Sequence, residues 1–394
     1  MKKFVLFATL LLVIVALTAC AAPTPTPAPK PTDAPKPTAV PPTAVPATKA
    51  PEPTKPPEAT KPPAPTATTA APAPTATQAA AAKPTVPVAK CDPVGAPIAV
   101  KAGDLGSADK PIVMSFVPSG DVARITKGGQ DIGDCLKKMY GLNFRIEVGT
   151  TFAASIEAMG ANKAQVGFLN TFSVLLARAK YDIEPALAVM RRYNTNAIDP
   201  DKADAGKLTA YYKGQFIAKK DSGIKGYADL KGKTFCFVDP NSTSGYIIPN
   251  IILKANGINS EKDLKAVQNA GSHNNVGLAV YKGDCDAGVT FIDVLTDAAA
   301  NLKATYPDIA DKVVAFAVTD KIPNDGVQFV KGFDPALKKA ITDGLVAMAK
   351  DPGGNVVLRS IYSIDDFQVI NATFYDEFSG VLKKAGVDPA SLVK

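Results

Sequence analysis

Residues 234–257 read TFCFVDPNSTSGYIIPNIILKANG and show the local pattern from which the fold class can be predicted. This stretch opens with a short apolar run of strand length, Thr234–Val238, which leads into a polar junction holding three consecutive hydroxyl residues. A helical stretch, Gly245–Ala255, follows the junction. A short strand leading into a helix is the repeating unit of α/β proteins, so the stretch predicts one such unit.

The same alternation recurs on both sides of this stretch. It predicts further strands at Ile112–Val117, Asn143–Val148, Gln165–Leu169, Lys265–Asn269 and Asp286–Thr290, and helices near Asp131–Tyr140, Ala153–Ala161, Phe172–Tyr181 and Asn274–Lys282. Strands that alternate with helices at this spacing pair mainly in parallel. The expected fold class is therefore α/β with mainly parallel sheets.

Polar residues gather at three of the predicted strand-to-helix junctions, where α/β folds bind their ligands. The first junction contains Ser242, Thr243 and Ser244. The free N–H groups at a helix start favour an anion, and nearby hydroxyls add donors. A hydroxyl there commonly caps its own helix, but one cap needs only one of the three. We expect all three to bind an anion.

The other two junctions add a histidine and an asparagine. His273, the only histidine in the chain, lies in the sequence GSHNN at the end of a predicted strand. A lone histidine is usually structural, but this position favours contact with a ligand. The third junction, GFLNT at residues 167–171, places Asn170 beside the helix that begins at Phe172.

Composition separates an amino-terminal tract from the part that folds. Of 34 prolines, 21 lie in residues 21–90, a tract without apolar runs that could offset the entropy of ordering. The net charge of +7 also lies mainly in this tract and in Lys2 and Lys3, which leaves about +1 for residues 91–394. The folded part therefore has no basic stripe for nucleic acid, and no nucleic-acid partner is expected.

The first twenty residues, MKKFVLFATLLLVIVALTAC, have two lysines before an apolar run too short to span a membrane stably. This pattern is typical of a secretion signal. The end of the run, Leu17–Cys20, resembles the lipobox of bacterial lipoproteins. That resemblance implies a signal peptide over 1–19, a lipid-modified Cys20, and a Pro-rich tether over 20–90. The expected location is the extracytoplasmic face of a bacterial membrane, held there by the lipid anchor.

Four further cysteines, Cys91, Cys135, Cys236 and Cys285, remain for the folded part. An even number in an exported protein favours disulfides, and three pairings are open. Because there is no CxxC motif and only one histidine, we expect no zinc site and no metal. No cofactor is expected either.

Three motifs together resemble one protein family. PNSTSG followed by Tyr246, AGSHNNVGLAVYKGDCDAG at residues 270–288, and IPNDG at 322–326 resemble the phosphonate/phosphite/phosphate-binding lipoproteins of ABC importers, over most of residues 110–380. The resemblance implies a type II periplasmic-binding fold, in which two lobes close over a ligand. It places lobe 1 at 91–212 and 318–394, lobe 2 at 213–317, and crossover strands near 212–217 and 316–318. It also implies a permease and an ATPase as partners.

The resemblance implies roles for individual residues. Hydroxyls matching Ser242, Thr243 and Ser244 hold the phosphonyl oxygens with His273, and the other matching positions are Tyr212 (or Tyr211), Asp325 and, for an amino group on the ligand's tail, Asp293. Several members have a tyrosine where this chain has Phe152. Thr150 or Thr151 is the expected substitute donor.

The lobe assignment implied by the resemblance also favours one disulfide pairing. Cys91–Cys135 falls within lobe 1 and Cys236–Cys285 within lobe 2. A bridge between lobes would obstruct the hinge closure that such receptors use.

The expected ligand is a phosphorus oxyanion: phosphate, phosphite or a phosphonate. No lysine or arginine is assigned to the site, whereas Asp325 would face the anion unfavourably unless it accepts a hydrogen bond from a P–OH group. Sulfate offers no such proton near neutral pH. We therefore expect discrimination against sulfate and simple sulfonates.

Alternatives of other classes stay open at this point. Ser242, His273 and Asp325 are the residue types of a hydrolytic triad, although the chain lacks a G-x-S-x-G elbow. Receptors for thiamine precursors, sulfonates or nitrate, sensory modules and surface structural proteins are further possibilities. We expect a monomeric solute receptor that is not an enzyme.

Overall fold

The structure, a computed structural model, describes residues 86–392 of the chain. The expected signal peptide, Cys20 and nearly all of the expected tether lie outside the described residues. Within the described range, no helix combines the length and the apolar character needed to cross a bilayer.

A seven-stranded sheet organises one half of the folded part. Its strands are β1 (Ile112–Phe116), β2 (Phe144–Val148), β3 (Val166–Leu169), β4 (Glu184–Arg192), β5 (Leu208–Thr209), β13 (Gly326–Phe329) and β14 (Asp366–Val369). The order is β14-β4-β13-β3-β1-β2, with β5 beside β4. We call these strands and the helices packed on them the seven-stranded half.

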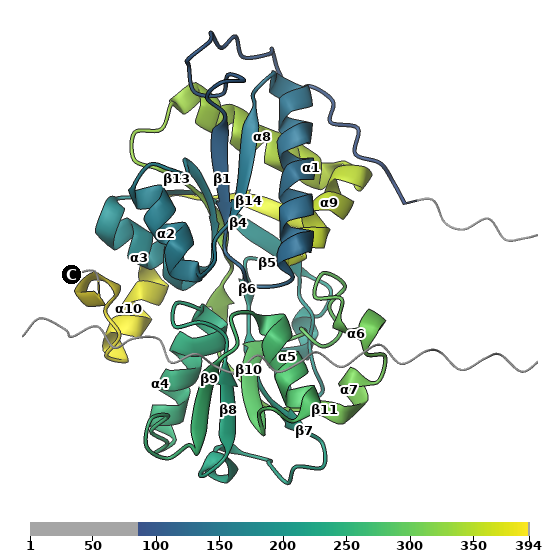
Figure 1. The fold of residues 1–394 in the computed structure, drawn as a ribbon, viewed down its shortest axis with the longest axis vertical. Coiled ribbons are helices and arrows are strands. Elements are labelled where there is room, and N and C mark those ends of the chain that lie inside the picture. The colour runs from purple at the N-terminus through teal and green to yellow at the C-terminus, as the bar shows by residue number, and fades with distance from the viewer. Residues whose placement is uncertain (1–85, 393–394) are drawn as a thin grey trace, which may run out of the picture. The chain divides into compact units, whose positions relative to one another are not determined.

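The helices of this half come from both ends of the described chain. They are α1 (Val122–Tyr140), α2 (Phe152–Gly160), α3 (Thr171–Tyr181), α8 (Pro335–Lys350), α9 (Pro352–Tyr362) and α10 (Asp376–Lys384), with the short turn η4 (Pro389–Leu392). In Figure 1 the yellow-green helices α8 and α9 lie beside the blue helix α1.

A five-stranded sheet organises the remaining residues, which we call the five-stranded half. Its strands are β7 (Gly214–Lys219), β8 (Thr234–Phe237), β9 (Ala266–Asn269), β10 (Ala287–Phe291) and β11 (Val313–Val318), in the order β11-β7-β10-β8-β9. Its helices are α4 (Ile248–Ala255), α5 (His273–Lys282), α6 (Leu302–Thr305) and α7 (Ile309–Lys312), with the turns η2 (Tyr227–Leu230) and η3 (Thr243–Ile247). Phe216, Phe235 and Phe237 form the centre of its apolar core.

The α/β fold class is confirmed, and each sheet combines two pairing modes. The parallel pairs are β1 with β2 and β3, and β8 with β9 and β10. All of these strands belong to the alternation that the sequence predicts. The antiparallel pairs involve β4, β7, β11, β13 and β14, which return the chain across a sheet or between the sheets.

The chain passes between the two halves twice. The first passage runs from β6 (Tyr211–Tyr212) into β7, and the second runs from β11 into β12 (Ile322–Pro323). β6 and β12 pair with each other, antiparallel, beside the two passages. The loop between β4 and β5 contains the short turn η1 (Lys202–Asp204).

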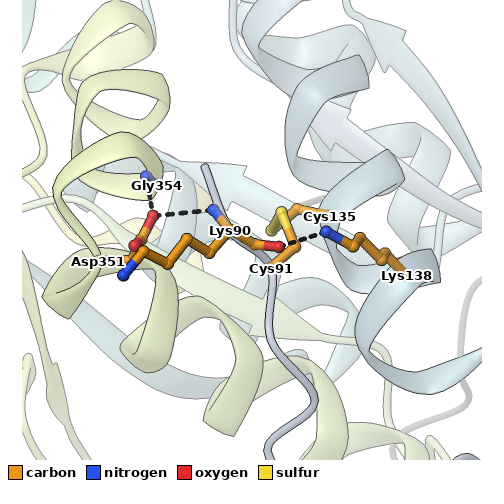
Figure 2. The surroundings of a disulfide bond; sticks show 6 residues. All are labelled: Lys90, Cys91, Cys135, Lys138, Asp351 and Gly354. Atoms are coloured by element: carbon orange, nitrogen blue, oxygen red, sulfur yellow. Dashed lines mark hydrogen bonds between the residues drawn. A yellow bond between two sulfur atoms is a disulfide. The ribbon is translucent and has the colours of Figure 1, made fainter. Parts of the chain in front are cut away.

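Both expected disulfides are present. Cys236–Cys285 lies within the five-stranded half, and Cys91–Cys135 joins the segment before β1 to α1. Figure 2 shows that the residue before Cys91 is held as well: the Lys90 N–H donates to the Asp351 carboxylate (3.2 Å), and Lys138 donates to the Lys90 carbonyl. The start of the described chain is therefore fixed to two helices of the seven-stranded half.

Candidate functional site

A cavity of about 260 Å³ lies between the two halves of the fold. Seven of the nine predicted ligand residues line it: Asn170, Tyr212, Ser242, Ser244, His273, Asp293 and Asp325. Four of these belong to the five-stranded half, and the others come from the seven-stranded half and the connecting strand β6. A cavity enclosed from both sides is the common geometry of small-molecule sites.

The hydroxyl triplet follows β8, and each of its residues is only 1 % exposed. Ser242 caps the following turn, since its Oγ accepts the Gly245 N–H at 3.2 Å. Gly245 is required there because a Cβ would come within 2.3 Å of Val238 Cγ2. With capping done by Ser242, Ser244 is left to face the cavity.

Thr243 and Thr151 are the two predicted ligand residues that the structure does not place in the cavity lining. The Thr243 Oγ1 accepts hydrogen bonds from the Phe172 N–H and the Asn170 amide, both at 2.9 Å. Thr151 is exposed and caps α2, with its Oγ1 accepting the Ala154 N–H at 3.1 Å. Its extended backbone turns the hydroxyl toward its own helix, so the substitute donor expected for Phe152 is not found at this position.

His273 is held as a neutral hydrogen-bond donor. Its Nδ1 accepts the Phe291 N–H at 3.1 Å, which places the proton of the neutral ring on Nε2. That Nε2 lies 3.5 Å from the Ser242 hydroxyl, at the cavity. Burial, with a smaller effect of the Arg191 charge, lowers the pKa of His273 to about 3. The ring therefore stays uncharged at neutral pH.

This lowered pKa predicts an acid-sensitive fold. Between pH 6.5 and 3 the unfolded chain binds a proton at His273 and the folded protein does not, so stability is lost as the pH falls. The slope is about 1.4 kcal/mol per pH unit, or about 2 kcal/mol between pH 6.5 and 5. Urea unfolding of the unaltered protein and of His273→Gln at pH 7 and pH 5 measures this loss of unfolding free energy, which should be larger in the unaltered protein. Carboxyl groups titrate in both proteins, so parallel losses would refute the neutral, buried histidine.

The structure adds an arginine that the sequence analysis did not assign to the site. Arg191, at the end of β4, donates to Asp325 Oδ2 at 3.1 Å, and its guanidinium lies 5.5 Å from the Tyr212 ring centre. The expectation of a site without lysine or arginine is therefore wrong. Arg191 comes close to Asp325 through a contact between distant parts of the sequence. The Val189 N–H of β4 donates to the Asp325 carbonyl at 2.9 Å.

Two polar atoms of this ion pair have no hydrogen-bond partner among the described residues. They are Arg191 Nε and Asp325 Oδ1, and both are buried. Burial raises the pKa of Asp325, and the neighbouring guanidinium opposes that shift. The pair therefore presents one unused donor and one unused acceptor beside the cavity.

Part of the cavity lining is acidic, since it includes Asp293 and Asp297. Asp293 accepts a hydrogen bond from Asn194 at 2.5 Å, across the two halves. Burial, together with the charge of Asp297, raises the pKa of Asp293 to about 6. Asp297 is itself bonded to the Ala300 N–H and to the Ser363 hydroxyl. These carboxyl groups can accept a cationic or hydrogen-bond-donating group.

The three residue types of a triad are present but are arranged differently. In a hydrolytic triad the histidine Nδ1–H donates to a carboxylate and Nε2 accepts the serine proton. Here Nδ1 of His273 accepts a backbone N–H, so Nε2 carries the proton. Asp325 is paired with Arg191 instead of the histidine. The geometry offers donors to a ligand and does not offer a base to Ser242.

The chain is similar in sequence to known proteins. The chain matches the family model of the ABC transporter phosphonate periplasmic substrate-binding protein over residues 114–375. It is 27 % identical over 218 residues to the phosphate-import protein PhnD of Mycolicibacterium smegmatis, covering 51 % of this chain and 64 % of that protein. It is 25 % identical over 265 residues to the phosphonates-binding periplasmic protein of Escherichia coli, covering 64 % and 73 %. The match thus spans just under two thirds of the first relative's length.

Solved structures show the same fold. A binding protein component of an ABC phosphonate transporter from Pseudomonas aeruginosa superposes with a TM-score of 0.60 at 19 % identity, covering 72 % of this chain and 93 % of that one. PhnD1 from Prochlorococcus marinus, solved with methylphosphonate, gives 0.58 at 18 % identity, covering 70 % and 98 %. With the family model covering well over half of its residues, the chain belongs to the periplasmic substrate-binding proteins of phosphonate ABC transporters.

Proposed function

We propose that this protein captures a phosphorus oxyanion between its two halves and delivers it to the permease and ATPase of an ABC importer. The observation that carries the proposal is the convergence of neutral donors from Ser242, Ser244, Tyr212 and His273 on one enclosed cavity. Burial and the charge of Asp325 raise the pKa of Tyr212, so its hydroxyl keeps its proton. Buried donors of this kind suit an oxyanion that leaves water.

Different groups in the cavity lining suit the two ends of a phosphonate. The hydroxyls and His273 would hold the phosphonyl oxygens, and Asp325 would accept a P–OH proton while Arg191 compensates its charge. Asp293, which also lines the cavity, would accept an amino group carried by the organic tail. Asn170 lines the same cavity.

The wider organisation is part of the proposal. Lobe 1 would comprise 91–212 and 318–394 and lobe 2 would comprise 213–317, with closure about the two connecting passages. A lipid on Cys20 would hold the monomeric protein on the extracytoplasmic face of the membrane. Because Cys91–Cys135 and Lys90 fix the chain's entry to the seven-stranded half, a tether attached there would leave the other half free to move.

We propose that the protein acts as a receptor and not as a hydrolase. The protonated Nε2 of His273 supports this, since it cannot accept a proton from Ser242. The pairing of Asp325 with Arg191 supports it as well. Incubation with activated esters followed by mass spectrometry should leave the protein's mass unchanged, and an adduct on Ser242 would refute the proposal.

Loss of one hydroxyl donor is expected to weaken binding strongly. Hydrogen bonds to charged groups contribute about 1.5–3 kcal/mol, so Ser244→Ala should bind methylphosphonate roughly 10- to 150-fold more weakly. Isothermal titration of the full mature chain measures this. Ser360→Ala, a serine on α9 that bonds only its own helix, is the matched control and should bind normally. Equal affinity of the two variants would place the site elsewhere.

A further inference from the structure

Thr243 reaches across the cavity boundary to cap a helix of the other half. Its Oγ1 accepts the N–H of Phe172, which lies in the first turn of α3, at 2.9 Å. Thr243 belongs to the five-stranded half, and α3 belongs to the seven-stranded half. The first N–H groups of a helix have no partner within the helix and are normally capped by a preceding residue of the same chain segment. Here a residue 71 positions away supplies the cap.

The residue placed to cap α3 does not do so. Asn170 occupies the N-cap position, where asparagine is among the most favoured residues, yet its side chain makes no capping bond. Its amide nitrogen donates instead to Thr243 Oγ1 and to the Asn241 carbonyl, both at 2.9 Å. Both acceptors lie in the five-stranded half.

These contacts are buried. Phe172 and Thr243 are 1 % exposed and Asn170 is 4 % exposed, so separating the halves would leave the Phe172 N–H and the Asn170 amide without their partners. When the halves separate, Asn170 can make a different hydrogen bond. Its side-chain oxygen can accept an N–H of the first turn of α3 and so cap its own helix. Asn170 Oδ1 has no partner among the described residues in the present state, so it is available for that bond.

We propose that Thr243 and Asn170 form a closure latch: Thr243 caps α3 in the closed state, and Asn170 caps it in the open state. The latch rests on the proposed function and deepens it, because it gives Thr243 a role in the closing equilibrium. A latch of this kind raises the apparent affinity for every ligand that requires closure, by the factor with which it favours the closed state. It leaves the choice among ligands to the cavity residues.

The test removes the acceptor without changing the shape of the side chain. Thr243→Val is expected to lower the affinity for methylphosphonate and for phosphate by the same factor, roughly 5- to 150-fold, chiefly through faster dissociation. Asn170→Ser keeps a favoured cap for α3 and removes the amide donors, so it should shift binding in the same direction. Thr151→Val deletes a cap within one half and is the matched control, expected to bind within twofold of the unaltered protein.

A distance measurement separates a latch from a ligand contact. Spin labels on the exposed positions Gln130→Cys in α1 and Lys262→Cys in the five-stranded half report the separation of the halves without ligand and with saturating methylphosphonate. Thr243→Val should lose part of the shorter-distance population of the unaltered protein. Weaker binding with unchanged distances in both states would assign Thr243 to the ligand and overturn the latch, as would unchanged affinity.

The outcome for the unaltered protein keeps the two proposals distinct. If the unaltered protein binds none of the phosphorus oxyanions, the proposed function fails. The latch is then tested by the spin-label distances measured without ligand. If Thr243→Val shows the same distances as the unaltered protein, the latch proposal is wrong.

Discussion

Sulfate is expected to bind at least about 10⁴-fold more weakly than methylphosphonate. Asp325 Oδ1 is a buried acceptor without a hydrogen-bond partner among the described residues, so we expect it to accept a hydrogen from the ligand. Phosphate and phosphonates carry a P–OH proton on part of their molecules near neutral pH, whereas sulfate does not. A site built around a hydrogen bond rejects an analogue that cannot make it by factors of about 10⁴ or more.

Arg191 adds a positive charge to the site, but the expected preference for methylphosphonate over sulfate remains. Its guanidinium compensates the carboxylate through Oδ2, so the site tolerates an anion, and Oδ1 still requires a donor. Titrations with methylphosphonate, phosphite, phosphate and sulfate measure the ratio. Asp325→Asn should reduce the ratio of the affinities for methylphosphonate and sulfate, because an amide can donate to a fully deprotonated oxygen. Sulfate binding as tight as methylphosphonate binding would contradict the role given to Asp325.

The second large effect concerns stability. Arg191→Met is expected to lower the free energy of unfolding at pH 7 by about 3 kcal/mol, because it leaves the Asp325 carboxylate buried without its counter-charge. The low end of the usual range applies, since 18 % of each side chain is exposed. Denaturant unfolding measures this loss.

The double variant Arg191→Met/Asp325→Asn is the control for this effect. It removes both charges, so most of the lost stability should return. Because the unpaired carboxyl can be neutralised by a proton, the loss in Arg191→Met should also shrink as the pH falls toward 5. A single variant as stable as the unaltered protein would show that the pair contributes nothing to the fold.

Local sequence pattern predicted the strand–helix units and not the strands between them. β1, β2, β3, β8, β9 and β10 are all within one or two residues of their expected bounds, because they alternate with helical stretches at short, regular spacing. β4, β13 and β14 pair antiparallel with partners far away in the sequence. The sequence of β4, Glu184–Arg192, is EPALAVMRR. It does not alternate between apolar and polar residues, so its pattern does not distinguish a strand from a helix.

The missed strand explains the missed arginine. Arg191 reaches the site only because β4 lies beside β13, which carries the chain from Asp325. Thr151 and Thr243 show a second limit: the sequence marks a hydroxyl at a junction, but the local backbone and the opposite half decide whether it caps a helix or faces the cavity. The residues at the junctions after β8 and before α5 were predicted because their positions follow from the α/β topology itself.

A crystal structure of the protein grown with methylphosphonate would show where the ligand binds. We expect the phosphorus atom in the cavity between the halves, with phosphonyl oxygens at hydrogen-bond distance, about 2.6–3.0 Å, from Ser244, Tyr212 and His273 Nε2. We also expect one oxygen next to Asp325 Oδ1. Methylphosphonate bound outside this cavity, or an empty cavity at a ligand concentration that saturates binding in solution, would contradict this expectation.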